Sequence, residues 1–442
     1  MRLRLLALAC LLGSCVRAPA GTAAPTPHVY LVVVDGLDPR VATPERMPRL
    51  FDVLAREPER SSFFPAARAI MPARTNPNHV TLLTGVYADA HGITGNAYWS
   101  REPGAPPQKL DAAALLEVET LFTVIQVTRP SLVTLGAFGK PKLARLFASV
   151  RGRQRAPDVL WSPEQLPSGR RDPATGYASD AETMSAALAK MARTEPDLAV
   201  LNLSDVDRVG HAYGPDGPEY ARAVGGADVA LADLVEDLRA RGRWEGAVLI
   251  VTADHGMTSV APTAERPHPV ISLGPALRDV GAVAVAEGGV EHVYAADASV
   301  LPRAAAVAAA SPGVVEVLSR HPVEGVGTID DRHPDWHLDH QRAGDLLLVA
   351  ERGCQFVDPS DPVDAALRGN HGGPAELAVP LIVTGGWSGL ARATGGAPGL
   401  VDVAPTIATL LGLRRPRRLD GSAVPAERAG RPIEAVLAQR PH

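Results

Sequence analysis

Short runs of apolar residues recur along this chain, and stretches with a helical pattern separate them. The runs have the length of buried strands: Val29–Val34, Val133–Ala137, Leu198–Leu203, Ala247–Thr252 and Leu377–Thr384. Apolar residues at helical spacing mark the intervening Met184–Met191 and Tyr220–Arg241. This alternation predicts an α/β fold in which a mostly parallel central sheet carries helices on both faces.

Acidic residues and a histidine follow three of these runs. Asp35 ends the first run, Asp205 and Asp207 come shortly after the third, and Asp254-His255 follows the fourth. In open α/β sheets, ligands bind beyond the carboxyl ends of the strands. We therefore expect these side chains to converge, although they are far apart in the sequence.

A second, smaller unit is expected within the second half of the chain. Residues 261–343 carry their own strand patterns, around Val283–Val285 and Val314–Leu318, and an Ala-rich helical stretch near Ala304–Ala310. We interpret them as an α+β cap inserted into a core made of residues 26–260 and 344–442.

The N-terminal residues 1–20 have the pattern of a secretory signal peptide. Arg2 and Arg4 precede the apolar stretch Leu5–Leu12, and small residues follow. Leu12-Gly13-Ser14-Cys15 resembles a lipoprotein cleavage box, which would leave a lipid anchor on Cys15, whereas Ala18-Pro19-Ala20 suits an ordinary signal peptidase. Both routes predict a secreted or periplasmic protein that touches a membrane only through such an anchor.

Charge and cysteine content exclude some functions and leave others open. The 442 residues carry a formal net charge of −5, so we expect no nucleic acid polymer as a partner. Cys10 and Cys15 lie in the signal, which leaves Cys354 alone and predicts a mature fold without an internal disulfide. The oligomeric state stays open.

Three short motifs carry the residue types of a metal site. Asp207-Arg208-Val209-Gly210-His211 can turn an acid and an imidazole toward one point, and Asp254-His255 directly follows a strand. Asn370-His371-Gly372-Gly373 places a third imidazole before another strand. Carboxylates and imidazoles are good ligands for divalent metals, but each motif alone also fits an ordinary loop or turn.

A threonine marks a candidate nucleophile. In Arg74-Thr75-Asn76-Pro77-Asn78-His79, Pro77 belongs in a first helical turn, so Thr75 is expected at or near the N-cap. A plain helix cap is one interpretation. The other is that the helix N-terminus forms an anion site and that the hydroxyl, beside a metal, attacks phosphorus.

Taken together, these motifs resemble the alkaline phosphatase superfamily, and within it the type I phosphodiesterase/nucleotide pyrophosphatase family. The resemblance runs from the Asp35 strand to the helical pattern of Asp402–Leu413. It implies an alkaline-phosphatase-like fold with two divalent ions on either side of a metal-bound Thr75. One ion would be held by Asp35, Asp254 and His255, and the other by Asp207, His211 and His371. Asn96, in His91-Gly92-Ile93-Thr94-Gly95-Asn96, would donate to a non-bridging phosphoryl oxygen.

The resemblance also implies a reaction. In-line attack by Thr75 would give a phospho-threonine intermediate, which water would then hydrolyse at two metal ions about 4 Å apart. Nitrogen and oxygen ligands without a thiolate suit Zn2+ first, and also Mn2+ or iron. The expected substrates are small-molecule phosphate esters, with phosphodiesters or pyrophosphates first. A sulfatase is excluded, because its nucleophile needs a Cys or Ser in a different motif.

Two departures from this family keep an alternative open. Asn76 stands where nucleotide-cleaving members often carry an aromatic residue, and Tyr98 and Trp99 either replace that stacking surface or pack a loop. Phe138-Gly139-Lys140-Pro141-Lys142 resembles phosphonoacetate hydrolases, in which two such lysines grip a carboxylate. If Lys140 and Lys142 are not merely a solvated basic turn, they predict a phosphonate or phosphomonoester substrate with a second anionic group.

Overall fold

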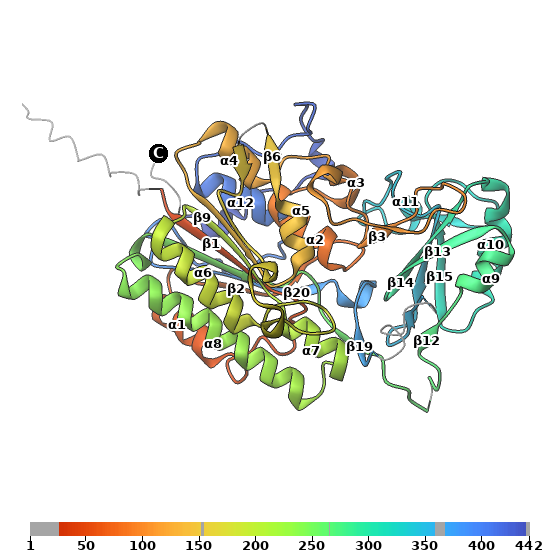
Figure 1. Ribbon diagram of the computed structural model, residues 1–442, viewed down its shortest axis with the longest axis horizontal. Coiled ribbons are helices and arrows are strands. Elements are labelled where there is room, and N and C mark those ends of the chain that lie inside the picture. Colours follow the sequence, from red (N-terminus) through yellow and green to blue (C-terminus); the bar gives the residue numbers. More distant parts are fainter. Residues whose placement is uncertain (1–25, 152–153, 265, 359–366, 439–442) are drawn as a thin grey trace, which may run out of the picture.

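The computed structural model describes residues 26–438, except 152–153, 265 and 359–366. A large sheet flanked by helices forms one unit, and a smaller unit lies beside it (Figure 1). The predicted signal peptide, with Cys10 and Cys15, falls outside the described residues. Among the described residues, Cys354 is a buried free cysteine, and no helix combines the length and apolarity needed to span a bilayer.

The central sheet has seven strands, and most of them run parallel. In spatial order they are β2 (Ser62–Arg68), β20 (Ala378–Thr384), β10 (Ala247–Thr252), β1 (His28–Val34), β9 (Leu198–Leu203), β5 (Thr134–Phe138) and β8 (Val159–Trp161). The strands from β10 to β8 are parallel to one another, whereas β20 is antiparallel to both of its neighbours. The predicted mostly parallel sheet is confirmed, but its two edge strands, β2 and β8, were not predicted from the sequence.

Helices cover both faces of this sheet, as predicted (Figure 1). On one face, α8 (Pro218–Ala240) packs against α1 (Pro48–Arg56), α6 (Asp180–Thr194) and α7 (Asp205–Tyr213). On the other face, α2 (Thr75–Thr84) contacts α4 (Leu121–Thr128), α5 (Pro141–Phe147) and α12 (Val403–Leu410). Because both faces are covered, β9 and β10 are buried along their whole length, which explains why they are apolar rather than alternating.

The reversed direction of β20 decides which residues meet at the edge of the sheet. Thr252, the last residue of β10, pairs with Leu381 in the middle of β20, and Leu249 pairs with Thr384 at its end. The chain segment that precedes β20 therefore lies at the same edge as the carboxyl ends of the parallel strands. This places His371, which comes before β20, next to Asp254 and His255, which come after β10.

The smaller unit contains a five-stranded sheet. Its strands, in spatial order, are β13 (Ala282–Glu287), β14 (Val290–Ala295), β17 (Leu346–Ala350), β15 (Val314–Ser319) and β16 (Gly327–Thr328). The helices α9 (Gly274–Asp279) and α10 (Leu301–Ala309) share its own apolar core with this sheet. We call this unit the cap.

The cap extends further along the chain than the sequence indicated. We predicted that it spans residues 261–343, but β17 is the middle strand of its sheet, and β18 (Gln355–Phe356) pairs with β12 (Val270–Ile271). The cap thus continues to Phe356. The apolar run Leu346–Ala350 is equally suited to a core strand or a cap strand, and only its long-range pairing with β14 and β15 decides between them.

Candidate active site

The carboxyl edge of the central sheet gathers the predicted site residues. Asp35 follows β1, Lys140 follows β5, and Asp207 lies in the first turn of α7 just beyond β9. Asp254 and His255 follow β10, and His371 enters from the segment before β20. His211 lies in the last turn of α7, and with it the structure brings all six predicted metal-ligand side chains to one place.

The ligand atoms of these residues form two adjoining groups. In the first, the Nε2 atoms of His211 and His371 lie 3.3 and 3.6 Å from Asp207 Oδ1. In the second, His255 Nε2 lies 3.3 Å from Asp254 Oδ2 and 3.6 Å from Asp35 Oδ1. The rings of His255 and His371 stack with centroids 3.4 Å apart, so the two groups share a boundary.

The three histidines present the same ring nitrogen to the site. Nδ1 of His211 lies 2.9 Å from Gly369 O, Nδ1 of His371 lies 2.7 Å from Ala73 O, and Nδ1 of His255 lies 2.9 Å from Gly256 O. A carbonyl oxygen can only accept, so each Nδ1 carries the hydrogen and each Nε2 keeps a free lone pair. Such a backbone contact is the usual way in which a protein orients a metal-binding imidazole.

Several buried polar atoms at this place fit a bound cation. Among the described residues, Asp207 Oδ1, Asp254 Oδ2 and His255 Nε2 are buried and have no hydrogen-bond partner. Buried acceptors without partners are rare, because their desolvation is costly. Burial also lowers the pKa of His255 and of His371, which favours the neutral imidazole that a metal requires. These atoms are therefore candidate ligands for a divalent metal.

The ammonium of Lys140 is bound to carboxylates of the site itself, and therefore it is not free for the tail of a substrate. Its Nζ atom donates to Asp35 Oδ1 at 2.7 Å and to Asp207 Oδ2 at 2.6 Å, and it lies 3.4 Å from Thr75 Oγ1. Burial opposes the charge of the lysine, but Asp207 and Asp35 outweigh it and raise the pKa of Lys140. The ammonium thus joins one carboxylate of each predicted metal set to the predicted nucleophile.

Lys142 differs from Lys140 in its surroundings. It is half-buried and, within the part of the chain that the structure describes, forms no hydrogen bond or ion pair. Burial and the neighbouring Lys140 charge lower the pKa of Lys142 to about 7. Of the two predicted substrate-binding lysines, Lys142 is the one whose ammonium is not already paired with a site carboxylate.

The backbone around Thr75 is held firmly. Thr75 is the first residue of α2 and is 1% exposed, and Arg74 is the N-cap residue. Asn78 clamps the preceding loop: its Nδ2 donates to the carbonyls of Ile70, Pro72 and Arg74, and its Oδ1 accepts from Ile70 N. The sequence placed Asn78 near the start of a helix but did not predict this clamp.

Asn96 lies over the start of the same helix. Its Oδ1 accepts a hydrogen bond from Asn76 N at 3.1 Å. Asn76 is buried and donates from its side chain to Leu110 O. It therefore provides no stacking surface at the position where nucleotide-cleaving members often carry an aromatic residue. Trp99 packs against Tyr294 in the cap and donates to Ala105 O. Of the two interpretations of Trp99, the structure therefore supports packing of a loop.

Three further residues reach the site that the sequence alone did not assign. Asn202 in β9 donates from Nδ2 to Asp35 Oδ2 at 2.9 Å, and His79 in α2 lies 3.3 Å from Asp254 Oδ2. The Tyr177 ring faces Lys140 Nζ at 5.4 Å. Asn202 could have been noticed as a lone amide in an apolar strand. Tyr177 precedes α6 in a loop and carries no comparable signal.

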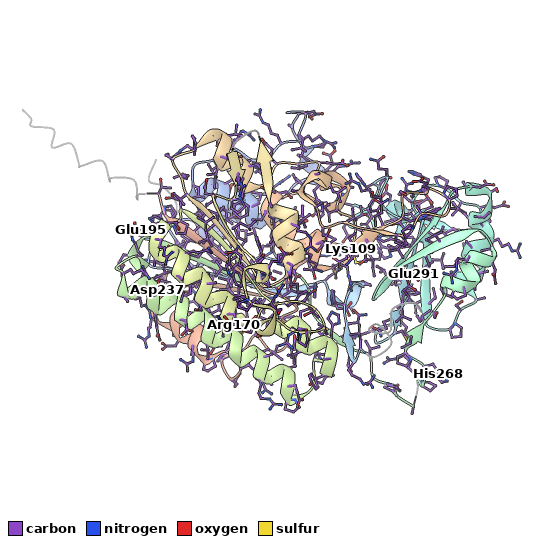
Figure 2. All side chains as sticks on the ribbon, in the orientation of Figure 1. Lys109, Arg170, Glu195, Asp237, His268 and Glu291 are labelled. Atoms are coloured by element: carbon purple, nitrogen blue, oxygen red, sulfur yellow. The ribbon has the colours of Figure 1, made fainter. Side chains whose placement is uncertain are left out.

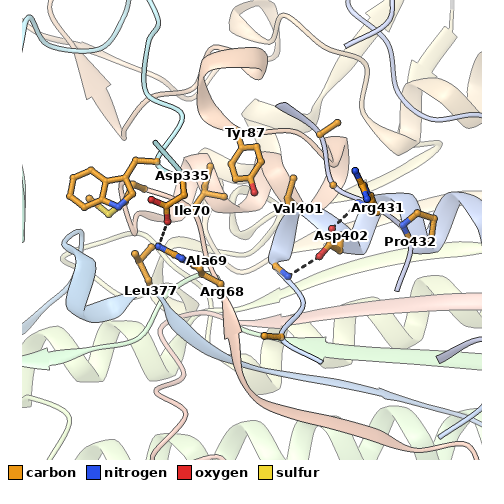
Figure 3. Close-up of a pocket in the computed structure, with 16 residues that line it drawn as sticks. Arg68, Ala69, Ile70, Tyr87, Asp335, Leu377, Val401, Asp402, Arg431 and Pro432 are labelled. Atoms are coloured by element: carbon orange, nitrogen blue, oxygen red, sulfur yellow. Dashed lines mark hydrogen bonds and ion pairs between the residues drawn. The ribbon is translucent and has the colours of Figure 1, made fainter. Parts of the chain in front are cut away.

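A separate cavity of about 390 Å3 lies away from these residues, and Figure 3 shows its lining. Three of its charged side chains already have partners: Arg68 pairs with Asp335, and Asp402 accepts from the backbone N–H groups of Gly399 and Arg431. None of the predicted site residues lines this cavity. The candidate active site is therefore the residue cluster at the sheet edge.

Residues 29–374 match the family described as type I phosphodiesterase / nucleotide pyrophosphatase. The chain belongs to this family. It is a family of enzymes, and the match covers the segments that carry Asp35, Thr75, Asp207, Asp254 and His371.

Known proteins agree with this assignment. The chain is 27% identical over 258 residues to human ectonucleotide pyrophosphatase/phosphodiesterase family member 7, a match that covers 58% of this chain and 53% of that protein. The curated relatives that it matches first are covered over little more than half of their length.

Solved structures confirm the fold. Human ectonucleotide pyrophosphatase/phosphodiesterase 5 superposes with a TM-score of 0.70 at 20% identity, over 93% of this chain and all of that one. Phosphonoacetate hydrolase from Sinorhizobium meliloti superposes with a TM-score of 0.64 at 22% identity, over 88% and 97%. The predicted alkaline-phosphatase-like architecture is thus confirmed.

Proposed function

We propose that this protein hydrolyses small phosphate esters, with phosphodiesters or pyrophosphates as the first class of substrate, at a centre of two divalent ions. The observation that carries the proposal is the set of buried, unpartnered ligand atoms on Asp207, Asp254 and His255, together with three imidazoles that all direct Nε2 into the site. Membership of the phosphodiesterase family supports the reaction class.

The residues divide into two ligand sets in this proposal. Asp207, His211 and His371, whose ligand atoms lie within 4.8 Å of one another, would hold one ion. Asp35, Asp254 and His255 would hold the other, with His255 Nε2 3.6 Å from Asp35 Oδ1 and 3.3 Å from Asp254 Oδ2. Each set supplies only oxygen and nitrogen donors. This chemistry suits Zn2+ first, with Mn2+ and iron as alternatives. When bound, such ions supply positive charge that activates oxygen nucleophiles and stabilises leaving oxygens.

The remaining residues would carry out the transfer. Thr75 Oγ1 loses its proton and attacks phosphorus in line, so that an O–P bond to Thr75 forms as the bond to the leaving oxygen breaks, and the leaving oxygen takes up a proton from solvent. Water then cleaves the phospho-threonine and restores the hydroxyl. Asn96 would donate from Nδ2 to a non-bridging oxygen, because its Oδ1 already accepts a hydrogen bond from Asn76 N. The start of α2, where Thr75 lies, favours negative charge.

One related structure supports small nucleotide-like ligands. The murine ectonucleotide pyrophosphatase/phosphodiesterase 5 was solved as an inactive variant in complex with AMP, and it superposes with a TM-score of 0.70 at 20% identity. We propose the same ligand class, a small phosphate-containing molecule, for this chain. From the sequence of residues 1–20 we also propose that the protein is secreted or periplasmic, with a lipid on Cys15 as the anchored form.

A second candidate activity is hydrolysis of a phosphonate or phosphomonoester that bears a second anionic group. Lys142 favours it, because this lysine is half-buried near Lys140 and forms no ion pair within the described part of the chain. The structural neighbour phosphonoacetate hydrolase was solved in complexes with phosphonoformate and phosphonoacetate. A tail that reaches Lys142 would explain why a second lysine lies at the site.

A substrate panel with matched variants tests both activities. Zinc-loaded protein would be assayed with an aryl phosphodiester, an aryl phosphomonoester and phosphonoacetate, before and after chelation. We expect Thr75→Ala to lower kcat roughly 10³-fold or more, whereas Thr128→Ala, in α4 outside the site, should not. Full activity of Thr75→Ala, or of the chelated protein, would refute the proposal. The preferred substrate in the panel decides between the two activities.

A further inference from the structure

A hairpin of the cap reaches into the active-site edge of the core. Strands β13 and β14 are joined through Gly288 and Gly289, and Gly289 N donates to His371 O at 3.0 Å. Gly288 has a φ of +72°, and a Cβ atom there would lie 2.0 Å from His371 O. A Cβ on Gly372 would lie 1.9 Å from Glu287 O. The turn and the His371 loop thus fit together only as glycine backbone.

Glu287 ends β13 and directs a buried carboxylate to the other side of this turn. Its Oε1 accepts from Asn96 N at 2.7 Å and from Ala97 N at 2.9 Å, and its Oε2 lies 2.9 Å from Arg74 Nε. The side chain is 1% exposed. A Cβ on Gly95 would lie 2.5 Å from Oε1, so the loop approaches closely only because that residue is glycine.

These contacts hold Asn96 from two directions. Glu287 of the cap fixes its backbone N–H, while Asn76 N of helix α2 holds its side-chain Oδ1. The direction in which Asn96 Nδ2 points is therefore set jointly by the cap and by the helix that begins at Thr75. The same carboxylate pairs with Arg74, the residue directly before Thr75.

We propose that Glu287 is a positioning residue, which aligns Asn96 Nδ2 and the start of the Thr75 helix with the reacting phosphoryl group. The inference rests on the proposed function. It means that the cap takes part in catalysis through Glu287, although the cap supplies none of the predicted metal ligands or the nucleophile. An isolated buried carboxylate is costly. Here two backbone N–H groups donate to Oε1, and Oε2 forms an ion pair with Arg74 but accepts no hydrogen bond from the described residues.

Kinetics of matched variants provide the first test. Glu287→Gln and Glu287→Ala would be compared with Glu291→Gln, which alters a second buried glutamate of the same hairpin (Figure 2) that touches neither Asn96 nor Arg74. We expect kcat for the best substrate to fall roughly 10- to 100-fold in Glu287→Ala and less in Glu287→Gln, with KM changed less than about threefold. Glu291→Gln should keep the wild-type kcat, and metal content and Tm should show that the variants are folded.

A double-mutant cycle separates positioning from general support of the fold. If Glu287 acts through Asn96, Glu287→Ala should lower kcat less than about threefold further in an Asn96→Ala background. Equal losses in both backgrounds would overturn the proposal, and so would a wild-type kcat in Glu287→Ala. Rescue by Glu287→Asp, which keeps the charge, is expected to be partial.

Binding of orthovanadate to the zinc-loaded protein gives a readout that needs no turnover. Isothermal titration calorimetry should show weaker vanadate binding in Glu287→Ala than in wild type and Glu291→Gln. If wild type binds vanadate but hydrolyses no member of the panel, the proposed function fails while this result still tests Glu287. If wild type is active and Glu287→Ala binds vanadate and turns over normally, only the positioning role fails.

Discussion

The Nε2 atom of His79 lies 3.2 Å from the Nδ2 atom of Asn202. An amide nitrogen can only donate, so Nε2 accepts and the hydrogen of the ring is on Nδ1. That nitrogen lies 3.0 Å from Thr75 O and 3.3 Å from Asp254 Oδ2. Both nitrogens of His79 are therefore engaged by the protein. This distinguishes His79 from His255, although both lie within reach of Asp35.

Metal analysis of two histidine variants checks this distinction. We expect the purified wild-type protein to hold two divalent ions per chain, His255→Ala to lose one, and His79→Gln to keep both, because only His255 has an unpartnered Nε2. Inductively coupled plasma mass spectrometry after dialysis measures the ratio. Loss of an ion from His79→Gln with two ions retained in His255→Ala would reverse the assignment.

The two site lysines should differ in what their loss affects. Lys140→Ala removes the cation that Asp35 and Asp207 share, so we expect roughly a 10-fold or larger loss of kcat with every substrate. Lys142→Ala should raise KM mainly for a substrate with a second anionic group, by about 10-fold. Steady-state kinetics on the substrate panel measure both. Equal effects of Lys142→Ala on diester and phosphonoacetate would contradict the second part.

The charge of Lys142 also predicts a pH dependence. Burial and the Lys140 charge lower its pKa to about 7, so the ammonium is present below that pH and lost above it. The inhibition constant of phosphonoacetate, measured against a diester substrate, should therefore rise as the pH goes from 6 to 8.5. Lys142→Arg, which keeps its charge, should flatten this rise. A constant that does not change with pH in the wild type would show that Lys142 does not meet the anion.

A buried glutamate of the cap predicts a pH dependence of stability. Burial raises the pKa of Glu291 from its ordinary value to about 8, because the protonated form suits an apolar site. Its contribution to stability is fully present below about pH 4.5 and is lost as the pH rises through 8. Glu291→Gln should thus gain at least about 2 °C in Tm relative to wild type between pH 5 and 9. Thermal unfolding followed by circular dichroism measures Tm at each pH. A difference in Tm between Glu291→Gln and wild type that stays constant from pH 5 to 9 would contradict the prediction.

Much of the site could be predicted because it follows a local rule. A polar residue directly after an apolar run marks a strand end, and Asp35 and Asp254 were found in this way. His371 was harder, since it precedes its strand. Only the antiparallel pairing of β20 with β10 explains why it joins the others, and from the sequence it depended on a family resemblance.

Long-range contacts were the part that the sequence could not supply. Glu287 stands before Gly288-Gly289 and resembles any charged residue at a hairpin turn, and nothing local indicates that it reaches Asn96. The prediction that residues 346–350 belong to the core was wrong for the same reason. These residues form β17 of the cap, and the partners of a strand depend on strands that are distant in the sequence. Tyr177 and Asn202 lie at the site only through the packing of α6 and β9.

The chain leaves the central sheet after His255 and returns to it at His371, and the rings of these two residues stack on each other. The cap is thus an excursion whose two ends meet at the ion-binding centre. Ions bound there would tie the two ends of the excursion together in the folded state, and because the site does not exist in the unfolded chain, their binding free energy would add to the stability of the fold. Away from the Glu287-Gly288-Gly289 turn, which touches Asn96 and His371, the excursion could change in length without altering the order of the strands in the central sheet.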